Sequence, residues 1–211
     1  VHYRRSGAAA RALAQEIRGL GVESWAVAAD LAQPDQAVRM FDRARKLAGP
    51  IDLLLNNAST YEPGRLGNVS SADILRSIRL HALSPLALGR RLAAQGRPGM
   101  IIHFLDARTL RQDPGHAAYQ LGKRLLHELT AMMALELAPK VRVNAIAPGA
   151  VLPPAGATPA YLRKLRRANP LQRLGSAEEV ARAAVYLAGT EFVTGQVLFV
   201  DGGYHLGRSL D

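Results

Sequence analysis

The chain has 211 residues, of which 48% are hydrophobic and 5% aromatic, and none is cysteine. A chain of this length can bury one substantial core, so we expect a single domain over residues 1–211. The lack of cysteine excludes disulfides and thiolate metal sites, and no apolar run approaches the roughly 20 residues of a membrane span. We therefore expect a cytoplasmic protein without a metal site.

The net charge is the most unusual feature of the composition. Lys and Arg number 27 against 17 Asp and Glu, which gives a formal charge of +10. Such a balance attracts polyanions, and nucleic acid is the usual partner to consider. The basic residues are scattered, however, and no basic run is interleaved with the aromatic residues on which bases stack. A solvated surface that also attracts phosphate-bearing cofactors is favoured, and no nucleic-acid partner is expected.

Short apolar strands alternate with helices along the whole chain. We predict strands at 1–3, 24–28, 51–55, 100–105, 141–146 and 196–200, and helices at 7–20, 33–47, 71–94, 115–137, 159–167 and 176–187. This alternation predicts an α/β fold, a Rossmann-like doubly wound parallel sheet with helices on both faces. In such a sheet ligands bind at the carboxyl ends of the strands.

Tyr119 and Lys123 lie four residues apart in the predicted helix 115–137. That spacing places both side chains on one face of the helix, about one turn apart. A lysine ammonium near a phenol lowers the tyrosine pKa toward the range of an acid or base catalyst. The spacing alone is weak, because it also describes a half-buried tyrosine beside a surface lysine.

Several spaced motifs support the catalytic interpretation. Asp106 lies thirteen residues before Tyr119, just past a predicted strand. Asn56-Asn57-Ala58 ends an earlier strand, Asn144 leads to Pro148-Gly149, and a late segment reads Val200-Asp-Gly-Gly203. This ordered set spans nearly the whole chain and resembles the short-chain dehydrogenase/reductase family.

The departures from the usual family pattern indicate a subgroup. Asp106 stands where that family usually has its catalytic serine, and Ser59 replaces the glycine after Asn-Asn-Ala. Both changes resemble the pteridine reductases and dihydromonapterin reductases. His81 stands where much of the wider family has a catalytic asparagine. We assign no catalytic asparagine, and we expect His81 to be a capped or core histidine rather than part of a water network.

The resemblance implies an NADPH-dependent reductase that transfers hydride to a pterin or folate substrate. Tyr119 would donate a proton, and Lys123 would bind the nicotinamide ribose and depress the tyrosine pKa. Asp106, hydrogen-bonded to Tyr119, would relay protons or hold a protonated substrate nitrogen. A carboxylate suits an imine better than a carbonyl, because it stabilises positive charge developing on nitrogen. The simpler alternative for Asp106 is a cap on the following turn.

Tyr61 follows Ser59 at the place where pteridine reductases present an aromatic ring that sandwiches the pterin. Flat heteroaromatic rings favour such stacking. An exposed loop tyrosine is an equally strong alternative. The loop at 151–159, rich in Pro, Ala and Gly, does not distinguish biopterin, monapterin and folate. The expected substrate-binding residues are Ser59, Tyr61, Asp106 and Tyr119.

Arg5 and Ser6 follow the first predicted strand, where an acid would bind the adenosine 2′-hydroxyl of NADH. Arginine accommodates a 2′-phosphate instead, so this pair favours NADPH. By resemblance, Asp30 and Leu31 would contact adenine and Pro148-Gly149 would close over the nicotinamide. The full set of expected cofactor residues is Arg5, Ser6, Asp30, Leu31, Asn57, Ala58, Ser59, Tyr119, Lys123, Pro148 and Gly149.

The family's glycine-rich phosphate loop has no counterpart between the first predicted strand and helix. Gly7, Gly19 and Gly21 do not form a cradle at a helix N-terminus. We expect that the sequence lacks about the first 30 residues of a βα unit. The alternative is a truncated protein that holds pyrophosphate poorly.

Two other functions stay open. One is an NADPH-dependent carbonyl reductase of the same family, for example a 3-oxoacyl reductase. The other, from a different class, is a non-catalytic NADP-binding or nucleic-acid-binding module. The resemblance also implies a homotetramer built partly on the long helices near Leu80 and Leu126.

Overall fold

The computed structural model describes residues 1–153 and 156–207. The elements are, in chain order, β1 (His2–Tyr3), α1 (Gly7–Gly19), β2 (Val27–Ala28), α2 (Pro34–Ala48), β3 (Leu53–Asn56), α3 (Ser71–Ile78), a π-helical turn η1 (Arg79–Leu83), α4 (Ser84–Ala93), β4 (Gly99–Phe104), a 3₁₀ turn η2 (Ala107–Leu110), α5 (Ala117–Glu136), β5 (Val141–Pro148), α6 (Pro159–Arg167), α7 (Ala177–Gly189), β6 (Val197–Val200) and a 3₁₀ turn η3 (Tyr204–Leu206). Each predicted strand and helix is present, although several bounds differ.

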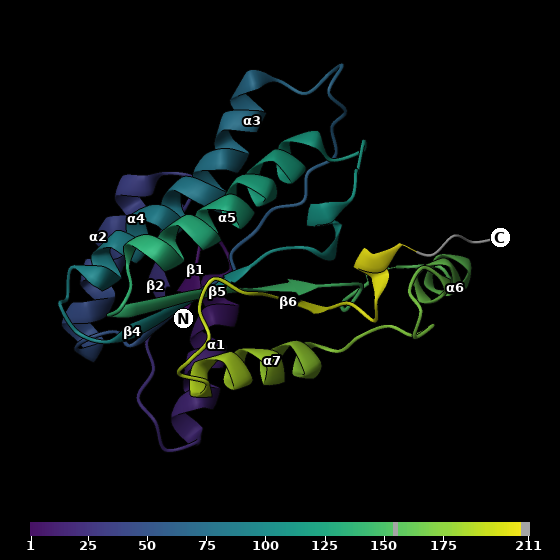
Figure 1. The fold of residues 1–211 in the computed structure, drawn as a ribbon. Coiled ribbons are helices and arrows are strands. Elements are labelled where there is room, and N and C mark those ends of the chain that lie inside the picture. Colours follow the sequence, from purple (N-terminus) through teal and green to yellow (C-terminus); the bar gives the residue numbers. More distant parts are fainter. Residues whose placement is uncertain (154–155, 208–211) are drawn as a thin grey trace.

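The strands form two parallel sheets. One has the order β1-β2 and the other β3-β4-β5-β6. Helices α2, α3, α4 and α5 lie on one face, and α1 and α7 lie on the other (Figure 1). The predicted Rossmann-like arrangement with helices on both faces is therefore confirmed. Within the described residues, no helix is long and apolar enough to cross a membrane.

Alternate residues of the central strands supply the two halves of the core. Ile101 of β4 and Val143 of β5 pack with Leu88 and Leu92 of α4. The residues next to Ile101, Met100 and Ile102, pack with Val180, Ala183 and Leu187 of α7. Successive side chains of a strand point to opposite faces of the sheet, so the apolar runs of β4 and β5 serve both layers.

Strand β3 is less buried than its apolar sequence suggests. Leu54 packs against the core beneath α4, but Leu53 is 40% exposed and Leu55 is 47% exposed. These two side chains lie on the α7 side of the sheet and line a cleft. Nothing among the described residues covers that face of β3, and β1 and β2 form a separate sheet. An apolar run therefore predicted the strand but not its burial.

The predicted helix 71–94 contains a widened turn. Helices α3 and α4 are joined through the π-helical turn η1, where the backbone N–H of Ser84 donates to the carbonyl of Arg79. Pro85 follows at once, and a proline inside a helix cannot donate to the carbonyl four residues earlier. A widened turn before it accommodates this loss. The turn carries His81 into the interior, where it is 1% exposed.

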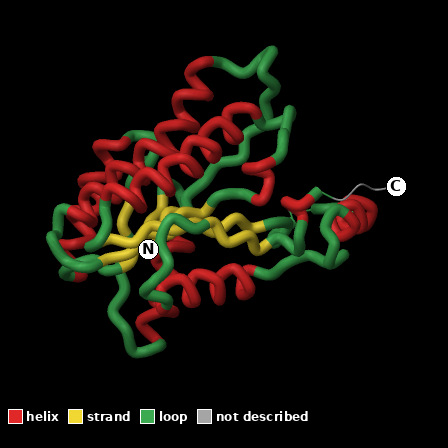
Figure 2. The backbone as a smooth tube through the Cα atoms, viewed as in Figure 1, coloured by secondary structure: helices red, strands yellow, loops and turns green. Residues whose placement is uncertain are grey.

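The loops that position side chains for chemistry leave the sheet at one end. Because β3, β4 and β5 are parallel neighbours, their carboxyl ends lie together. The segments that follow them extend from this end of the sheet (Figure 2). The predicted binding edge of the fold is therefore the edge at which Asn57, Asp106 and Gly149 follow their strands.

Gly122 provides a test of the contact between α3 and α5. A Cβ atom at Gly122 would lie 2.7 Å from the Ser77 hydroxyl and 3.0 Å from the Ser77 carbonyl oxygen. We expect Gly122→Ala to lower the free energy of unfolding by about 1–3 kcal/mol, because backbone must move to admit the methyl group. Urea denaturation measures the change.

Gly19→Ala is the matched control, since a Cβ there meets nothing within 4 Å. An alanine in a helix should stabilise this variant by up to about 1 kcal/mol. Equal stabilities of the two variants would contradict the close approach of α3 and α5.

Candidate active site

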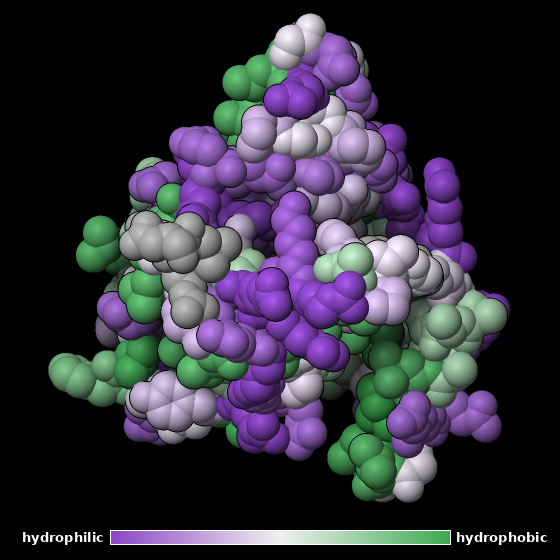
Figure 3. Space-filling view, turned by 90° about the vertical axis from the view of Figure 1, so that its right-hand side faces the viewer, coloured by the Kyte–Doolittle hydropathy of each residue, from purple (hydrophilic) through white to green (hydrophobic). Residues whose placement is uncertain are grey.

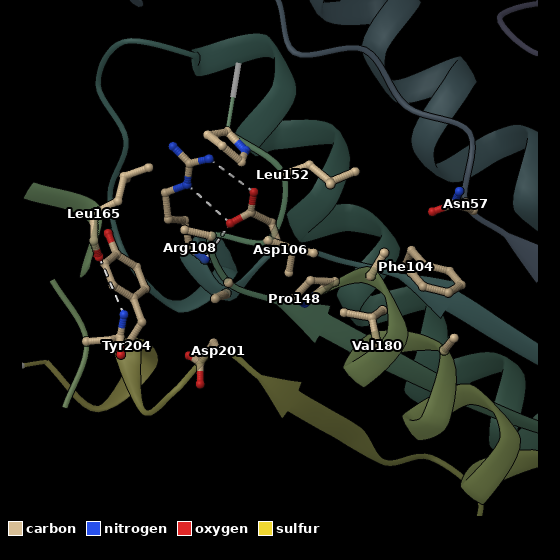
Figure 4. A pocket seen from close by; sticks show the side chains of 18 of the residues that line it. Asn57, Phe104, Asp106, Arg108, Pro148, Leu152, Leu165, Val180, Asp201 and Tyr204 are labelled. Carbon is tan, nitrogen blue, oxygen red and sulfur yellow. Dashed lines mark hydrogen bonds and ion pairs between the residues drawn. The ribbon is translucent and has the colours of Figure 1, made fainter. Parts of the chain in front are cut away.

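A cleft of about 1100 Å³ opens at the carboxyl ends of β3, β4 and β5. It extends from Asn57 and Phe104, past Asp106, to Leu165 and Tyr204 at the other end (Figure 4). Residues from the loops after three strands and from α6 and α7 line it. The cleft lies where the fold predicts a ligand site.

Tyr119 and Asp106 meet beside this cleft, as the sequence predicts. The Tyr119 hydroxyl donates a hydrogen bond of 2.8 Å to Oδ2 of Asp106. Tyr119 lies in the first turn of α5 and is 8% exposed, while Asp106 comes shortly after β4. Burial and the negative charge of Asp106 raise the pKa of Tyr119 above its ordinary value. The prediction that a neighbouring lysine lowers this pKa is therefore wrong.

Lys123 lies beneath the tyrosine on the same face of α5. Its side chain is buried, and Nζ donates a 2.6 Å hydrogen bond to the carbonyl oxygen of Phe104. Nζ lies 5.8 Å from the centre of the Tyr119 ring. Burial lowers the pKa of Lys123 to about 8, although the charge of Asp106 opposes this shift.

Asp106 has two partners, Tyr119 and Arg108, and the Arg108 guanidinium reaches both of its carboxylate oxygens. Oδ1 accepts a 2.7 Å hydrogen bond from the backbone N–H of Arg108, which caps the turn η2. Oδ2 accepts the Tyr119 hydroxyl. The two interpretations that the sequence left open, a turn cap and a partner of Tyr119, are both present, and the cap fixes the carboxylate that faces the tyrosine.

Arg108 is the site residue that the sequence did not reveal. Its Nε donates to Oδ1 of Asp106 at 3.2 Å, and Nη1 donates to Asp113 at 3.1 Å and to the Tyr61 hydroxyl. Burial acts to lower the pKa of Arg108, but the charge and hydrogen bonds of Asp106 together with the charges of Tyr61 and Asp113 raise it above its ordinary value, so the guanidinium stays charged. Spacing could not find this residue, because an irregular turn brings its partners together.

Tyr61 lines the cleft, but its ring is already packed. It stacks on His116 with 3.7 Å between ring centres and meets Tyr119 edge-on at 4.8 Å. The Arg108 guanidinium lies 4.8 Å over the same ring, and the Tyr61 hydroxyl donates to Asp113. The Tyr61 side chain is therefore held in place as part of the cleft wall. A flat substrate that stacks on Tyr61 would have to share the faces of the tyrosine ring with His116 and Arg108.

His81 is a buried core histidine, and it also holds the loop after β3. Nε2 lies 3.0 Å from the Ser59 hydroxyl and accepts from the backbone N–H of Thr60 at 3.4 Å. Nδ1 therefore carries the hydrogen and donates to the carbonyl of Ser77 at 3.0 Å. Burial and the charge of Lys123 lower the pKa of His81 to about 3, so it is neutral near pH 7.

Three of the expected cofactor residues line the cleft, namely Asn57, Pro148 and Gly149. A Cβ at Gly149 would lie 2.7 Å from the Cα of Asp201, so glycine permits the ends of β5 and β6 to approach. The two residues after Asn57 do not line it: Ala58 packs on the core and Ser59 bonds to His81.

Other expected cofactor residues lie apart from the cleft. Arg5 and Ser6 are exposed at the start of α1. Asp30 accepts the backbone N–H of Ala32 at 3.0 Å, and the Leu31 side chain belongs to the core. The expected cofactor residues thus fall into two separate groups, and a glycine-rich loop between a strand and a helix N-terminus is not found in residues 1–153 and 156–207.

The chain resembles known oxidoreductases over nearly its whole length. Residues 1–205 match the family model described as enoyl-(acyl carrier protein) reductase. An uncharacterized oxidoreductase of Mycobacterium tuberculosis is 37% identical over 91% of this chain and 77% of its own length. The FolM alternative dihydrofolate reductase 1 from Brucella canis, complexed with NADP, superposes with a TM-score of 0.90 at 32% identity, covering 99% of this chain and 84% of that one.

A second solved structure is the promiscuous reductase LugOII, which catalyses keto-reduction at C1 during lugdunomycin biosynthesis. It superposes with a TM-score of 0.88 at 26% identity, covering 98% of this chain and 87% of that one. The motifs around Tyr119, the parallel fold and these matches agree. The chain belongs to the short-chain dehydrogenase/reductase family.

Proposed function

We propose that the protein is an NADPH-dependent reductase that converts a dihydropterin, such as dihydropteridine, dihydromonapterin or dihydrofolate, to its tetrahydro form. The observation that carries this proposal is the 2.8 Å hydrogen bond between the Tyr119 hydroxyl and the Asp106 carboxylate beside the cleft. A proton donor and an anion at one place suit a C=N bond, whose nitrogen becomes cationic when it is protonated.

The residues at both ends of the site fit NADPH, which supplies the hydride when bound. Arg5 and Ser6 lie at the N-terminus of α1, and a helix N-terminus together with an arginine favours a phosphate group. Asn57 and Gly149 line the cleft and would hold the nicotinamide end. The similarity to FolM, whose structure contains NADP, supports the same cofactor.

The side chains of this chain divide the proton chemistry between them. The raised pKa of Tyr119 keeps its hydroxyl protonated at neutral pH, as a proton donor requires. The anion of Asp106 stabilises positive charge on a substrate nitrogen but opposes negative charge on a carbonyl oxygen. Lys123, fixed by Phe104, would hold the ribose beside the tyrosine. This division favours an imine over a ketone.

A carbonyl reductase is the second candidate, since the Tyr119 and Lys123 pair also suits ketones and LugOII is a ketoreductase. NADPH oxidation should be compared with dihydrobiopterin, dihydromonapterin and an acetoacetyl thioester. We expect turnover of the pterins. Turnover of the thioester alone would reject the proposal in favour of a 3-oxoacyl reductase. Salt-sensitive nucleic-acid binding without any turnover would favour a non-catalytic module.

Tyr119→Phe removes the proposed proton donor and little else. We expect kcat to fall by about a hundredfold to ten-thousandfold, while NADPH binding, measured by calorimetry, stays near the wild-type value.

Asp106→Asn is a companion that removes the charge and keeps one acceptor oxygen, which can serve either Tyr119 or the cap of η2. We expect pterin turnover to fall more steeply than any residual thioester turnover. An equal fall for both substrates would show that the charge of Asp106 does not select an imine.

The buried charge of Lys123 should appear in the pH dependence of stability. Its pKa is about 8 in the folded chain against an ordinary value of 10.5, so the folded state binds fewer protons between these values. The free energy of unfolding should therefore rise with pH from about 8 to 9.5. Lys123→Met should abolish that rise and be more stable than wild type at pH 7.

Urea midpoints at several pH values measure this effect. Lys140→Met is the matched control, because Lys140 is exposed. Its pH profile should run parallel to that of wild type. If the pH profile of Lys123→Met also ran parallel to that of wild type, this would contradict a lowered pKa of the buried Lys123.

We further infer a cytoplasmic homotetramer. Leu80 and Leu126, near which the sequence placed the interface, are 8% and 1% exposed and belong to the interior of the chain. Apolar side chains that do face outward on α3 and α5 include Leu75, Met132 and Leu135, which are 51%, 60% and 84% exposed. These would supply the contacts between subunits.

A further inference from the structure

Helix α6 closes the end of the cleft farthest from Asn57 (Figure 4). Tyr161, Lys164, Leu165 and Ala168 line the cleft. Their spacing of three and four residues places them on one face of the helix. Lys164 is therefore the cation that α6 turns toward the cleft, while its other basic residues, Arg163, Arg166 and Arg167, do not line it.

This part of the chain has an unusual charge balance. Between Glu136 and Glu178 the sequence has seven Lys and Arg residues and no Asp or Glu. In the described part of the chain Lys164 forms no ion pair. Hydrophilic residues gather across the middle of the face that contains this end of the molecule (Figure 3). Within residues 1–153 and 156–207, no carboxylate pairs with the Lys164 ammonium.

The two carboxylates that line the cleft are already engaged. Asp106 is paired with Arg108 and Tyr119. The side chain of Asp201 is 2% exposed and accepts hydrogen bonds from the backbone N–H groups of Gly203 and His205. Arg108 in turn is neutralised by Asp106 and Asp113. Among the described residues that line the cleft, Lys164 is left as the cation without a carboxylate partner.

The position of this charge corresponds to the tail of a substrate rather than its reacting ring. Asp106, which accepts the hydrogen bond of the proton donor Tyr119, lies between the two ends of the cleft, and Asn57 marks the proposed nicotinamide end (Figure 4). A substituent that leaves the ring away from the nicotinamide would extend toward Leu165 and Lys164. Apolar side chains there suit an aromatic linker ahead of a charged group.

We propose that the α6 end of the cleft binds an anionic group at the end of the pterin side chain, a carboxylate or a phosphate, with Lys164 as its contact. The preferred substrate is then a pterin with an acidic tail, as in dihydrofolate, rather than one with a neutral side chain. This inference rests on the proposed pterin reduction and adds a specificity residue to it. Arg5 and Ser6, expected at the cofactor phosphate, do not line the cleft, so Lys164 has a separate role.

Steady-state kinetics with Lys164→Gln test the subsite. The substrates are dihydrofolate, a phosphorylated dihydropterin and the neutral dihydrobiopterin, each at saturating NADPH. We expect the KM of at least one anionic substrate to rise about three- to fivefold, the effect of losing an exposed ion pair. The KM of dihydrobiopterin and all kcat values should stay unchanged. The substrate with the larger rise identifies the anion.

Arg163→Gln is the matched control, since it removes one charge from the same helix outside the cleft wall. Its KM values should remain within about twofold of wild type, because solvent and salt screen an exposed charge that touches no ligand. An equal effect of both variants, an equal effect on neutral and anionic pterins, or no effect of Lys164→Gln on either anionic substrate would overturn the subsite.

Folate binding, measured by calorimetry, tests the subsite independently of the proposed reaction. If no pterin is turned over, the proposed reaction fails, and folate affinity then decides the subsite by itself. Weaker binding to Lys164→Gln but not to Arg163→Gln would retain it. Unchanged binding to both variants would reject it.

Discussion

The hydrogen bond between Tyr119 and Asp106 is the interaction on which the chemistry of this site depends. It joins the first turn of α5 to the residues after β4, two elements that the parallel sheet brings together. The cap of η2 and the Arg108 guanidinium hold the Asp106 carboxylate in this position. An anion beside a buried phenol keeps the proton on the phenol. The pair is thus built for donating a proton where positive charge, not negative charge, develops.

Lys123 imposes a second constraint, because a buried cation is costly unless its surroundings accommodate it. Its Nζ has the Phe104 carbonyl as partner, and Asp106 favours its charge. The two nearby histidines are buried and respond to the same cation. Burial and Lys123 lower the pKa of both His81 and His103 to about 3. Neutral imidazoles beside Lys123 leave Asp106 as the carboxylate that faces both this cation and the Arg108 guanidinium.

Local geometry explains which parts could be predicted from the sequence. The spacing of Tyr119 and Lys123 determines their common face, because helix periodicity is a local property. Asp106 is predicted from its place thirteen residues before Tyr119, just past a strand, and from the family resemblance. Arg108, and the His116 ring on which Tyr61 stacks, depend on an irregular turn that no periodicity describes. The exposure of one face of β3 could not be predicted for a related reason. An apolar sequence indicates a strand that tends to be buried, but not which elements cover it.

The fold determines which of the many basic side chains of this sequence can contact a ligand in the cleft. Counted along the sequence, Arg163, Lys164, Arg166 and Arg167 form one scattered basic segment with no evident ligand. In α6 these residues lie on different faces of the helix, so that Lys164 lines the cleft while the arginines do not. At physiological salt an exposed charge acts over about 8 Å. The arginines can therefore attract an anion to this end of the molecule, but only a side chain on the cleft wall can discriminate between one substrate and another.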